Sequence, residues 1–220
     1  MALTKFEYNS FDVTPVASNG FAFNSTPNGL TTASAGAMTL IKTQTASDVA
    51  SVEFKHGTSD VVLDGTYDTY LFKFIGMHPE TDATDMTVNF SVDTGSNYNV
   101  SKMTTFFRTQ HYENGTSGVV AYIAGNDLTE GTGEQYLNQD GSMGADNDQC
   151  LAGKMYLFNP SSTTFVKHFM SDTIEVNAGD RCREAFVAGY GNTTSAVDAV
   201  QFKMSTGNID AGDICLYGIL

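Results

Sequence analysis

The chain has 220 residues, with 11 basic side chains against 25 acidic ones and a formal net charge of −14 at neutral pH. Its 15 Phe and 10 Tyr exclude a disordered chain, its 4 Pro and 21 Gly exclude a collagen-like fibre, and no apolar run approaches the roughly 18–20 residues of a membrane helix. Binding to nucleic acid phosphates needs a clustered basic surface, which this composition does not favour. We therefore expect a globular protein with no nucleic acid and no membrane partner.

The first 36 residues differ in composition from the rest. Residues 1–36 mix Asn, Ser, Thr, Gly and Pro with spaced aromatic residues and show no helical period. They predict an extended N-terminal arm or, equally, an N-terminal strand of the main domain. The candidate partner-binding residues of this arm are its aromatic side chains: Phe6, Tyr8, Phe11, Phe21 and Phe23. Residues 37–220 are expected to form a single domain.

Two segments show the strand pattern most clearly. Residues 67–77 are mostly apolar, which is typical of a central strand covered on both faces and ending at His78-Pro79. Residues 86–93 alternate between apolar and polar, which predicts a half-buried strand with four residues on its inner face: Met86, Val88, Phe90 and Val92. Before these strands, residues 45–50 allow one helical turn.

The turns that follow separate further strands. Asn114-Gly115 lies between two strand candidates and is a strong hairpin signal, because Asn-Gly tolerates positive φ. Asn159-Pro160 suits a type I turn between two more. Near the end, residues 200–205 alternate again, and we expect three inward side chains there: Val200, Phe202 and Met204. About ten strand candidates with Gly and Asn turns predict an all-β fold, an antiparallel two-sheet sandwich resembling a jelly roll.

The connection 127–148 is long and polar, and we expect it to be a surface excursion. Its acidic and amide residues resemble a calcium loop: Asn138, Asp140, Ser142, Asp146 and Asp148. The order of ligands and the terminal Glu of a known calcium loop are missing, so a solvated acidic turn is the preferred interpretation. For the same reason, we interpret Thr81, Asp82 and Asp85 as part of a solvated acidic turn rather than a calcium site.

No other pattern of catalytic or metal-binding residues stands out. His56, His78, His111 and His168 lack metal-ligand spacing, although His111 and His168 could meet on neighbouring strands. Cys150, Cys182 and Cys215 are interpreted as three buried thiols, with one disulfide and one free thiol as the alternative. We therefore expect no enzyme, no cofactor and no metal. The first residues lack the apolar stretch of a signal peptide, which favours synthesis in a reducing cytoplasm.

Four segments of the chain carry a resemblance to a known family: residues 66–74, 157–169, 186–204 and 205–219. The closing Gly207-Asn208-Ile209 and Leu216-Tyr217-Gly218-Ile219 are the most specific part. Over residues 59–220 the chain resembles virion proteins of marine tailed bacteriophages, including those of cyanobacteria. The resemblance implies a jelly-roll sandwich used in particle structure, and it brings no catalytic residues.

Two functions follow as expectations. The first is a capsid decoration or cement protein, a homotrimer bound to the major capsid protein on the outer shell of the virion through residues 1–36. The second is a tail or fibre-associated protein that binds host surface polysaccharide through exposed aromatics and the 127–148 loop. A polysaccharide-degrading enzyme ranks last, because no acid pair or catalytic triad can be identified in the sequence.

Overall fold

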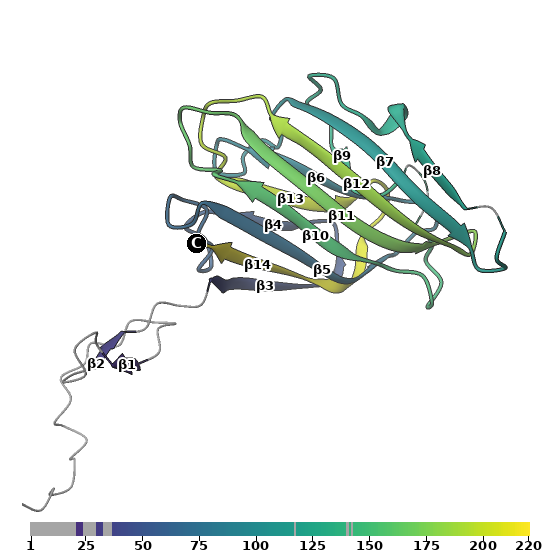
Figure 1. Cartoon of the computed structure of the whole chain (residues 1–220), viewed down its shortest axis with the longest axis horizontal. Helices are drawn as coiled ribbons and strands as arrows, with labels where there is room; N and C mark the ends of the chain where they lie inside the picture. Colours follow the sequence, from purple (N-terminus) through teal and green to yellow (C-terminus); the bar gives the residue numbers. More distant parts are fainter. Residues whose placement is uncertain (1–20, 24–29, 33–36, 117, 140, 142) are drawn as a thin grey trace, which may run out of the picture. The chain divides into compact units, whose positions relative to one another are not determined.

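The computed structural model describes residues 21–23, 30–32, 37–116, 118–139, 141 and 143–220 (Figure 1). The chain divides into two units, one ending at Met38 and one spanning Thr39–Leu220. In the first unit, β1 (Phe21–Phe23) pairs with β2 (Leu30–Thr32) in an antiparallel ladder.

The second unit is built from β-strands. In chain order they are β3 (Met38–Val49, whose first residue belongs to the first unit), β4 (Val52–Lys55), β5 (Thr69–Pro79), β6 (Met86–Ser91), β7 (Lys102–Tyr112), β8 (Val119–Tyr122), β9 (Gln135–Tyr136), β10 (Leu151–Phe158), β11 (Lys167–Asn177), β12 (Arg181–Gly191), β13 (Ala199–Met204) and β14 (Ile209–Ile219). A short 3₁₀ turn, η2 (Ala124–Asn126), lies between β8 and β9.

These strands form two sheets that pack face to face. The eight-stranded sheet has the order β3-β14-β5-β10-β11-β12-β7-β8, and the four-stranded sheet has the order β4-β13-β6-β9. Figure 1 shows the larger sheet in front of the smaller one. The predicted all-β antiparallel sandwich is therefore confirmed.

An aromatic cluster joins the sheets at the centre of the core. The ring of Phe202 on β13 lies 5.1 Å from that of Phe72 and 5.2 Å from that of Phe74, both on β5, in edge-to-face contacts. The three rings are at most 1% exposed. Edge-to-face pairs contribute about 0.5–1.5 kcal/mol beyond their buried area. The predicted inward alternation of Val200, Phe202 and Met204 is confirmed.

The predicted turns are also found. Gly115, with φ of 81°, donates its N–H to the carbonyl of Tyr112 in the connection between β7 and β8. Ser162 donates its N–H to the carbonyl of Asn159 at 3.1 Å, which closes a four-residue turn with Pro160 in second position.

Two predictions on the larger sheet are wrong. Residues 45–50 form no helical turn; Thr45–Val49 are extended in β3, where the Thr45 hydroxyl donates to Asp213 on β14. β5 is central and ends at Pro79 as predicted, but it is not covered on both faces, since Ile75 is 45% exposed. The four-stranded sheet packs on one side only, so side chains that point to the other side remain open to solvent.

In the smaller sheet, β6 is more buried than the sequence predicted. All six residues of β6 are buried, including Thr87, Asn89 and Ser91, whereas Val92 is 38% exposed. The cause is the 127–148 connection, which is packed against β6 rather than being a surface excursion. Its β9 pairs with β6, and several of its residues are at most 1% exposed: Gln135, Leu137, Asn138 and Met143.

The cysteine prediction is correct for one thiol of three. All three cysteines are free, so the disulfide alternative is not realised. Cys215 is buried, but Cys150 and Cys182 are exposed.

Candidate functional site

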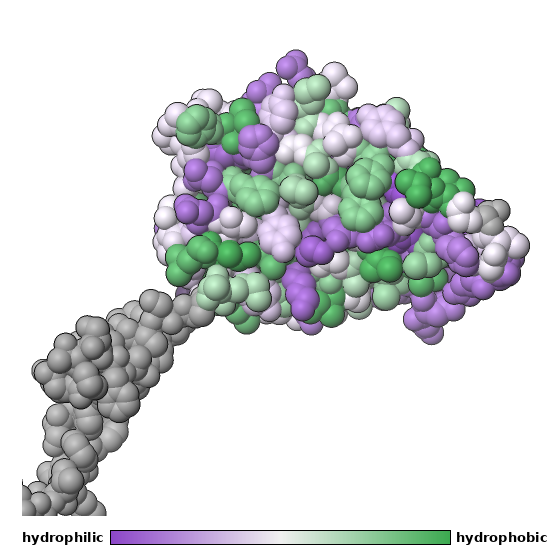
Figure 2. All heavy atoms as spheres, in the orientation of Figure 1, coloured by the Kyte–Doolittle hydropathy of each residue, from purple (hydrophilic) through white to green (hydrophobic). Residues whose placement is uncertain are grey.

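The most distinctive surface is the outer face of the eight-stranded sheet, which we define as the side chains of β5, β7, β8, β10, β11 and β12 that point away from the four-stranded sheet. Figure 2 shows apolar side chains over much of this face, with polar ones between them. Several large apolar residues on it are 43–77% exposed: Ile75, Met103, Phe107, Val120, Tyr122, Met170 and Ile174. Single exposed apolar residues are ordinary, but a contiguous group indicates an interaction surface.

Strand register explains how these residues gather. Met170 on β11 lies opposite Ala188 on β12, and Ala188 lies opposite Thr105 on β7. Because Ala188 is small and its neighbours are large, the face is hollowed there. One hollow of about 300 Å³ is lined by Phe107, Tyr156, Met170 and Phe186, among others. A second, of about 580 Å³, lies towards Phe158, His168 and Tyr190.

Two stacked aromatic pairs lie on the outer face. The rings of Phe107 and Phe186 stack with centroids 4.7 Å apart, and those of Tyr156 and Phe158 stack at 6.2 Å. Each pair presents a flat apolar surface, which suits either a protein partner or the face of a sugar ring.

The charges at the centre of this face are balanced. Lys154 donates to Asp172 at 2.7 Å, and this hydrogen bond raises the pKa of Lys154. Lys73 lies opposite Lys154 on β5, and Glu184 lies opposite Ile174 on β12. Two cations and two anions therefore occupy the middle of the face, in a chain whose net charge is −14.

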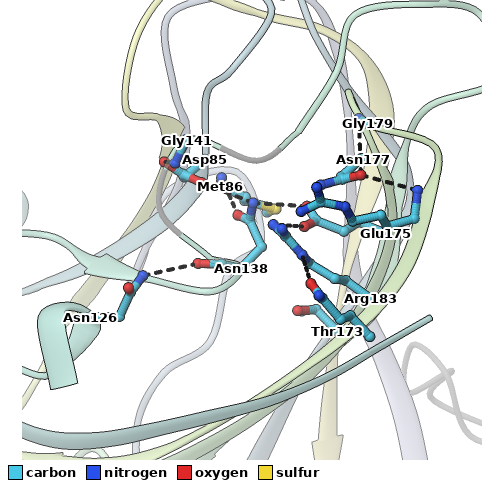
Figure 3. Close-up of polar contacts among 12 residues, drawn as sticks. Asp85, Met86, Asn126, Asn138, Gly141, Thr173, Glu175, Asn177, Gly179 and Arg183 are labelled. Carbon is cyan, nitrogen blue, oxygen red and sulfur yellow. Dashed lines mark hydrogen bonds and ion pairs between the residues drawn. The ribbon is translucent and has the colours of Figure 1, made fainter. Parts of the chain in front are cut away.

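A second candidate site is a buried polar cluster between the sheets, centred on Asn138 (Figure 3). The side-chain oxygen of Asn138 accepts the N–H of Met86 at 2.7 Å. Its amide group donates to Asp85 at 3.1 Å and to Glu175 at 2.9 Å. Asn138 follows β9, Asp85 precedes β6 and Glu175 lies on β11, so one side chain joins the two sheets.

The cluster extends through the larger sheet. Glu175 lies 3.7 Å from Arg183, whose Nε–H donates to Gln110 at 3.2 Å. Burial lowers the pKa of Arg183, while the Glu175 carboxylate acts in the opposite direction. The Thr173 hydroxyl donates to the carbonyl of Leu137 at 2.5 Å. A buried charge is stable only when it is paired and hydrogen-bonded, which these contacts provide.

A buried lysine completes the polar interior. Lys102 is fully buried and donates to Asn89 at 2.5 Å and to the carbonyl of Val100 at 2.9 Å. Burial lowers the pKa of Lys102 to about 8, with a smaller opposing effect from Glu134. Alternation in β7 predicts an inward residue here but not its charge, so sequence reasoning missed it.

The sites predicted from the sequence are only partly described. Phe6, Tyr8 and Phe11 lie outside the described residues; Phe21 and Phe23 lie in β1, where only the backbone is described. In the calcium candidate, Asp140 and Ser142 are also outside the described part. Asn138 is buried in the polar cluster, whereas Asp146 and Asp148 are exposed.

The histidine prediction can be examined in the strand register. His168 pairs with Tyr190 and His111 with Cys182, so the two histidines lie eight residues apart along β12, roughly 26 Å. They do not meet. Among the described residues, no group of three or more His, Cys, Asp or Glu side chains is arranged to hold a metal ion.

Comparison with known proteins gives no relative: no protein family, curated protein or solved structure matches the chain. Within the described part of the chain, no helix has the length and apolarity needed to cross a membrane.

Proposed function

We propose that the protein is a structural protein of a bacteriophage virion, a decoration or cement protein on the outer shell. The observation that carries the proposal is the apolar outer face of the eight-stranded sheet. Phe107, Met170 and Ile174 are examples of its exposed apolar side chains. When another protein covers such side chains, the free energy of the complex falls by about 25 cal/mol per Å² of apolar area buried. Assembly into a particle provides such a cover.

The occupant of this face that we propose is a second copy of the same chain, in a closed homo-oligomer such as the expected trimer. A net charge of −14 makes most of the surface repel another copy. The balanced charges of Lys73, Lys154, Asp172 and Glu184 remove that repulsion at the centre of the outer face. The aromatic residues of the N-terminal arm would then be left to contact the shell protein.

The sequence resemblance supports the same function. The four segments that carry it fall on β5, on the end of β10 and the start of β11, and on β12, β13 and β14. Five of these strands are consecutive in the larger sheet, β14-β5-β10-β11-β12. The segments therefore concentrate on the sheet that bears the outer face.

A tail-associated protein that binds host polysaccharide is the second candidate. The observation that favours it is the hollow lined by Phe158, His168 and Tyr190, where the His168 and Tyr190 rings lie 5.9 Å apart. Binding of purified protein to a glycan array, lost in Tyr190→Ala but kept in Tyr67→Ala, would support it.

The copy number per purified particle tests the proposal. It is measured by quantitative mass spectrometry against the major shell protein. A number comparable to that of the shell protein supports decoration of the head. A few copies per particle would favour the tail-associated candidate, and absence from the particle would overturn both.

The arm is tested separately in the full chain. Replacing Phe6, Tyr8 and Phe11 together by serine is expected to abolish binding to undecorated shells, because these side chains supply the apolar contact. The thermal melting curve should stay unchanged, since the sandwich core is formed by residues of the second unit. Unchanged shell binding by this variant would show that the arm is not the attachment.

A further inference from the structure

The three arginines of the chain lie together. Arg108 is on β7, and Arg181 and Arg183 are on β12. The two strands are antiparallel neighbours, with Arg183 opposite Gln110 and Arg108 opposite Ala185. Because side chains alternate along a strand, all three share the inward side of the sheet with buried Phe106 and Ala185. We call Arg108, Arg181 and Arg183 the arginine cluster.

The arginine cluster lies where the sandwich interior opens to solvent. Along β7 the inward side chains change from fully buried Phe106 to partly exposed Arg108, Gln110 and Tyr112. The guanidinium carbon of Arg181 lies 4.4 Å from the centre of the Tyr112 ring, a cation–π contact that holds this side chain in place. The cluster therefore lies at the margin of the buried core, where Arg108 and Arg181 are partly exposed.

The cluster has more positive charge than the neighbouring side chains neutralise. Glu175 forms an ion pair with Arg183, and no other carboxylate of the described residues forms one with these arginines. Burial lowers the pKa of Arg108, and the positive charge of Arg181 lowers it further, with smaller opposing effects from the Glu175 carboxylate and Tyr112. One paired carboxylate, Glu175, therefore stands against three guanidinium charges.

Hydrogen-bond donors are also unused. Nε and Nη1 of Arg108 and Nε of Arg181 are shielded from solvent and have no hydrogen-bond partner. Buried donors are almost always paired, so each unpaired one calls for an explanation. Guanidinium groups bind oxyanions through two parallel N–H donors, and an anion seated between Arg108 and Arg181 would satisfy these atoms.

We propose that the arginine cluster is a binding site for a dianionic oxyanion of the phosphate or sulfate class. Two unneutralised charges match a dianion better than a single carboxylate. The site is independent of the proposed function: it lies on the inward side of β7 and β12, opposite to the outer face. It gives the protein a ligand that its acidic composition does not suggest.

Isothermal titration of the full-length protein with sodium phosphate and sodium sulfate, at constant ionic strength, tests this site. We expect saturable binding of about one anion per chain, weakened at least about tenfold in Arg181→Gln. Lys73→Gln removes the same charge from the outer face and should leave the affinity unchanged. Acetate should bind more weakly than phosphate. Tighter binding of glucose 6-phosphate than of inorganic phosphate would identify a phosphate ester as the ligand, and equal binding the free anion.

Three results would overturn the proposal: no saturable binding by the wild-type protein, equal affinity in Arg181→Gln, or an equal loss in Lys73→Gln. Circular dichroism melts check that each variant folds. If Arg181→Gln does not fold, Arg181→Lys keeps the charge but loses the two-donor geometry, and it should still bind phosphate several-fold more weakly. Unchanged affinity in Arg181→Lys would then contradict the site.

Discussion

At the scale of single residues, Asn138 is the side chain that links the sheets most directly. It accepts one hydrogen bond from Met86 and donates to Asp85 and Glu175, all in the buried interior. When one partner of a buried hydrogen bond is removed, the remaining polar group is buried without a partner. This lowers the free energy of unfolding by about 1–3 kcal/mol for each such group, and by more for a charged group. The polar cluster is therefore sensitive to one substitution.

Asn138→Ala is expected to lower the free energy of unfolding by about 2–4 kcal/mol, because it takes one bond from each of two carboxylates and one backbone N–H. Urea denaturation followed by fluorescence measures the change. Asn192→Ala, at an exposed position, is the matched control and should change stability by less than about 0.5 kcal/mol. Equal effects of the two variants would show that the cluster does not join the sheets.

Lys102 gives the molecule a specific pH dependence. Its pKa is lowered from 10.5 to about 8 in the folded protein. Between these pH values the unfolded chain binds more protons than the folded one, so stability contributed by this group rises with pH. Going from pH 8 to 9.5, we expect a gain of about 1–2 kcal/mol in the free energy of unfolding.

Lys102→Met removes this titration and should flatten the stability profile between pH 8 and 9.5. The measurement is urea denaturation at several pH values, with the wild-type and variant curves subtracted. Lys42→Met, on β3, serves as the control and should retain the wild-type slope. A Lys102→Met profile parallel to that of the wild-type protein would refute the lowered pKa.

At the scale of elements, Gly189 sets the spacing of β12 against β7. A Cβ at this position would lie 2.4 Å from the carbonyl oxygen of Met103 and 3.0 Å from the Thr104 Cα. These are backbone atoms of the paired strand and cannot yield without separating the ladder. A side chain at position 189 therefore conflicts with the register of the larger sheet.

Gly189→Ala is expected to destabilise the protein by about 1–3 kcal/mol, the usual cost of overpacking, and any separation of β12 from β7 adds to this cost. Hydrogen exchange should show the loss of protection in β7 and β12 first. Gly133→Ala is the control, because a Cβ there would meet nothing within 4 Å. Similar exchange in both variants would contradict the proposed close approach.

Alternation and turn chemistry predicted the strands and hairpins, as at Val200–Met204 and Asn114-Gly115, because both are local properties of the chain. Burial of β6 could not be predicted, since Thr87 and Asn89 contact Glu134, Tyr136 and Thr132, more than 40 residues further along the chain. Asn138 was considered for metal binding because an amide that bridges two sheets and an amide that binds calcium look alike in sequence.

On the outer face, by contrast, β5 is less buried than its sequence predicted. The apolar sequence of residues 67–77 predicted cover on both sides of a strand, and the four-stranded sheet supplies cover on one side. Ile75 shows the difference. The sequence therefore predicted the apolar character of both sides of β5 correctly. The proposed second copy would cover the outer side, which the four-stranded sheet leaves exposed. The arginine cluster had no such signal, because Arg108 is separated from Arg181 by 73 positions.

At the scale of the whole molecule, self-association should depend on Met170 at the centre of the outer face, where it is 55% exposed. Met170→Glu places a charge in the apolar contact and is expected to raise the dissociation constant of the oligomer at least about tenfold. Light scattering after gel filtration measures this. Phe165→Glu, equally charged but in the turn before β11 and 68% exposed, should assemble normally. A wild-type protein that stays monomeric at high concentration would refute the proposed contact.

The order of strands in the larger sheet has a consequence for biosynthesis. β14 lies between β3 and β5, so residues 209–219 join strands that were synthesised about 170 and about 140 residues earlier. During synthesis, β3 and β5 therefore leave the ribosome before β14, with the strand edges that pair with β14 still unpaired. Sheets that pair strands distant in sequence form slowly. Unpaired edges invite contacts with other nascent chains. Wherever many copies of this chain are synthesised at once, correct folding depends on β14 emerging before such contacts form.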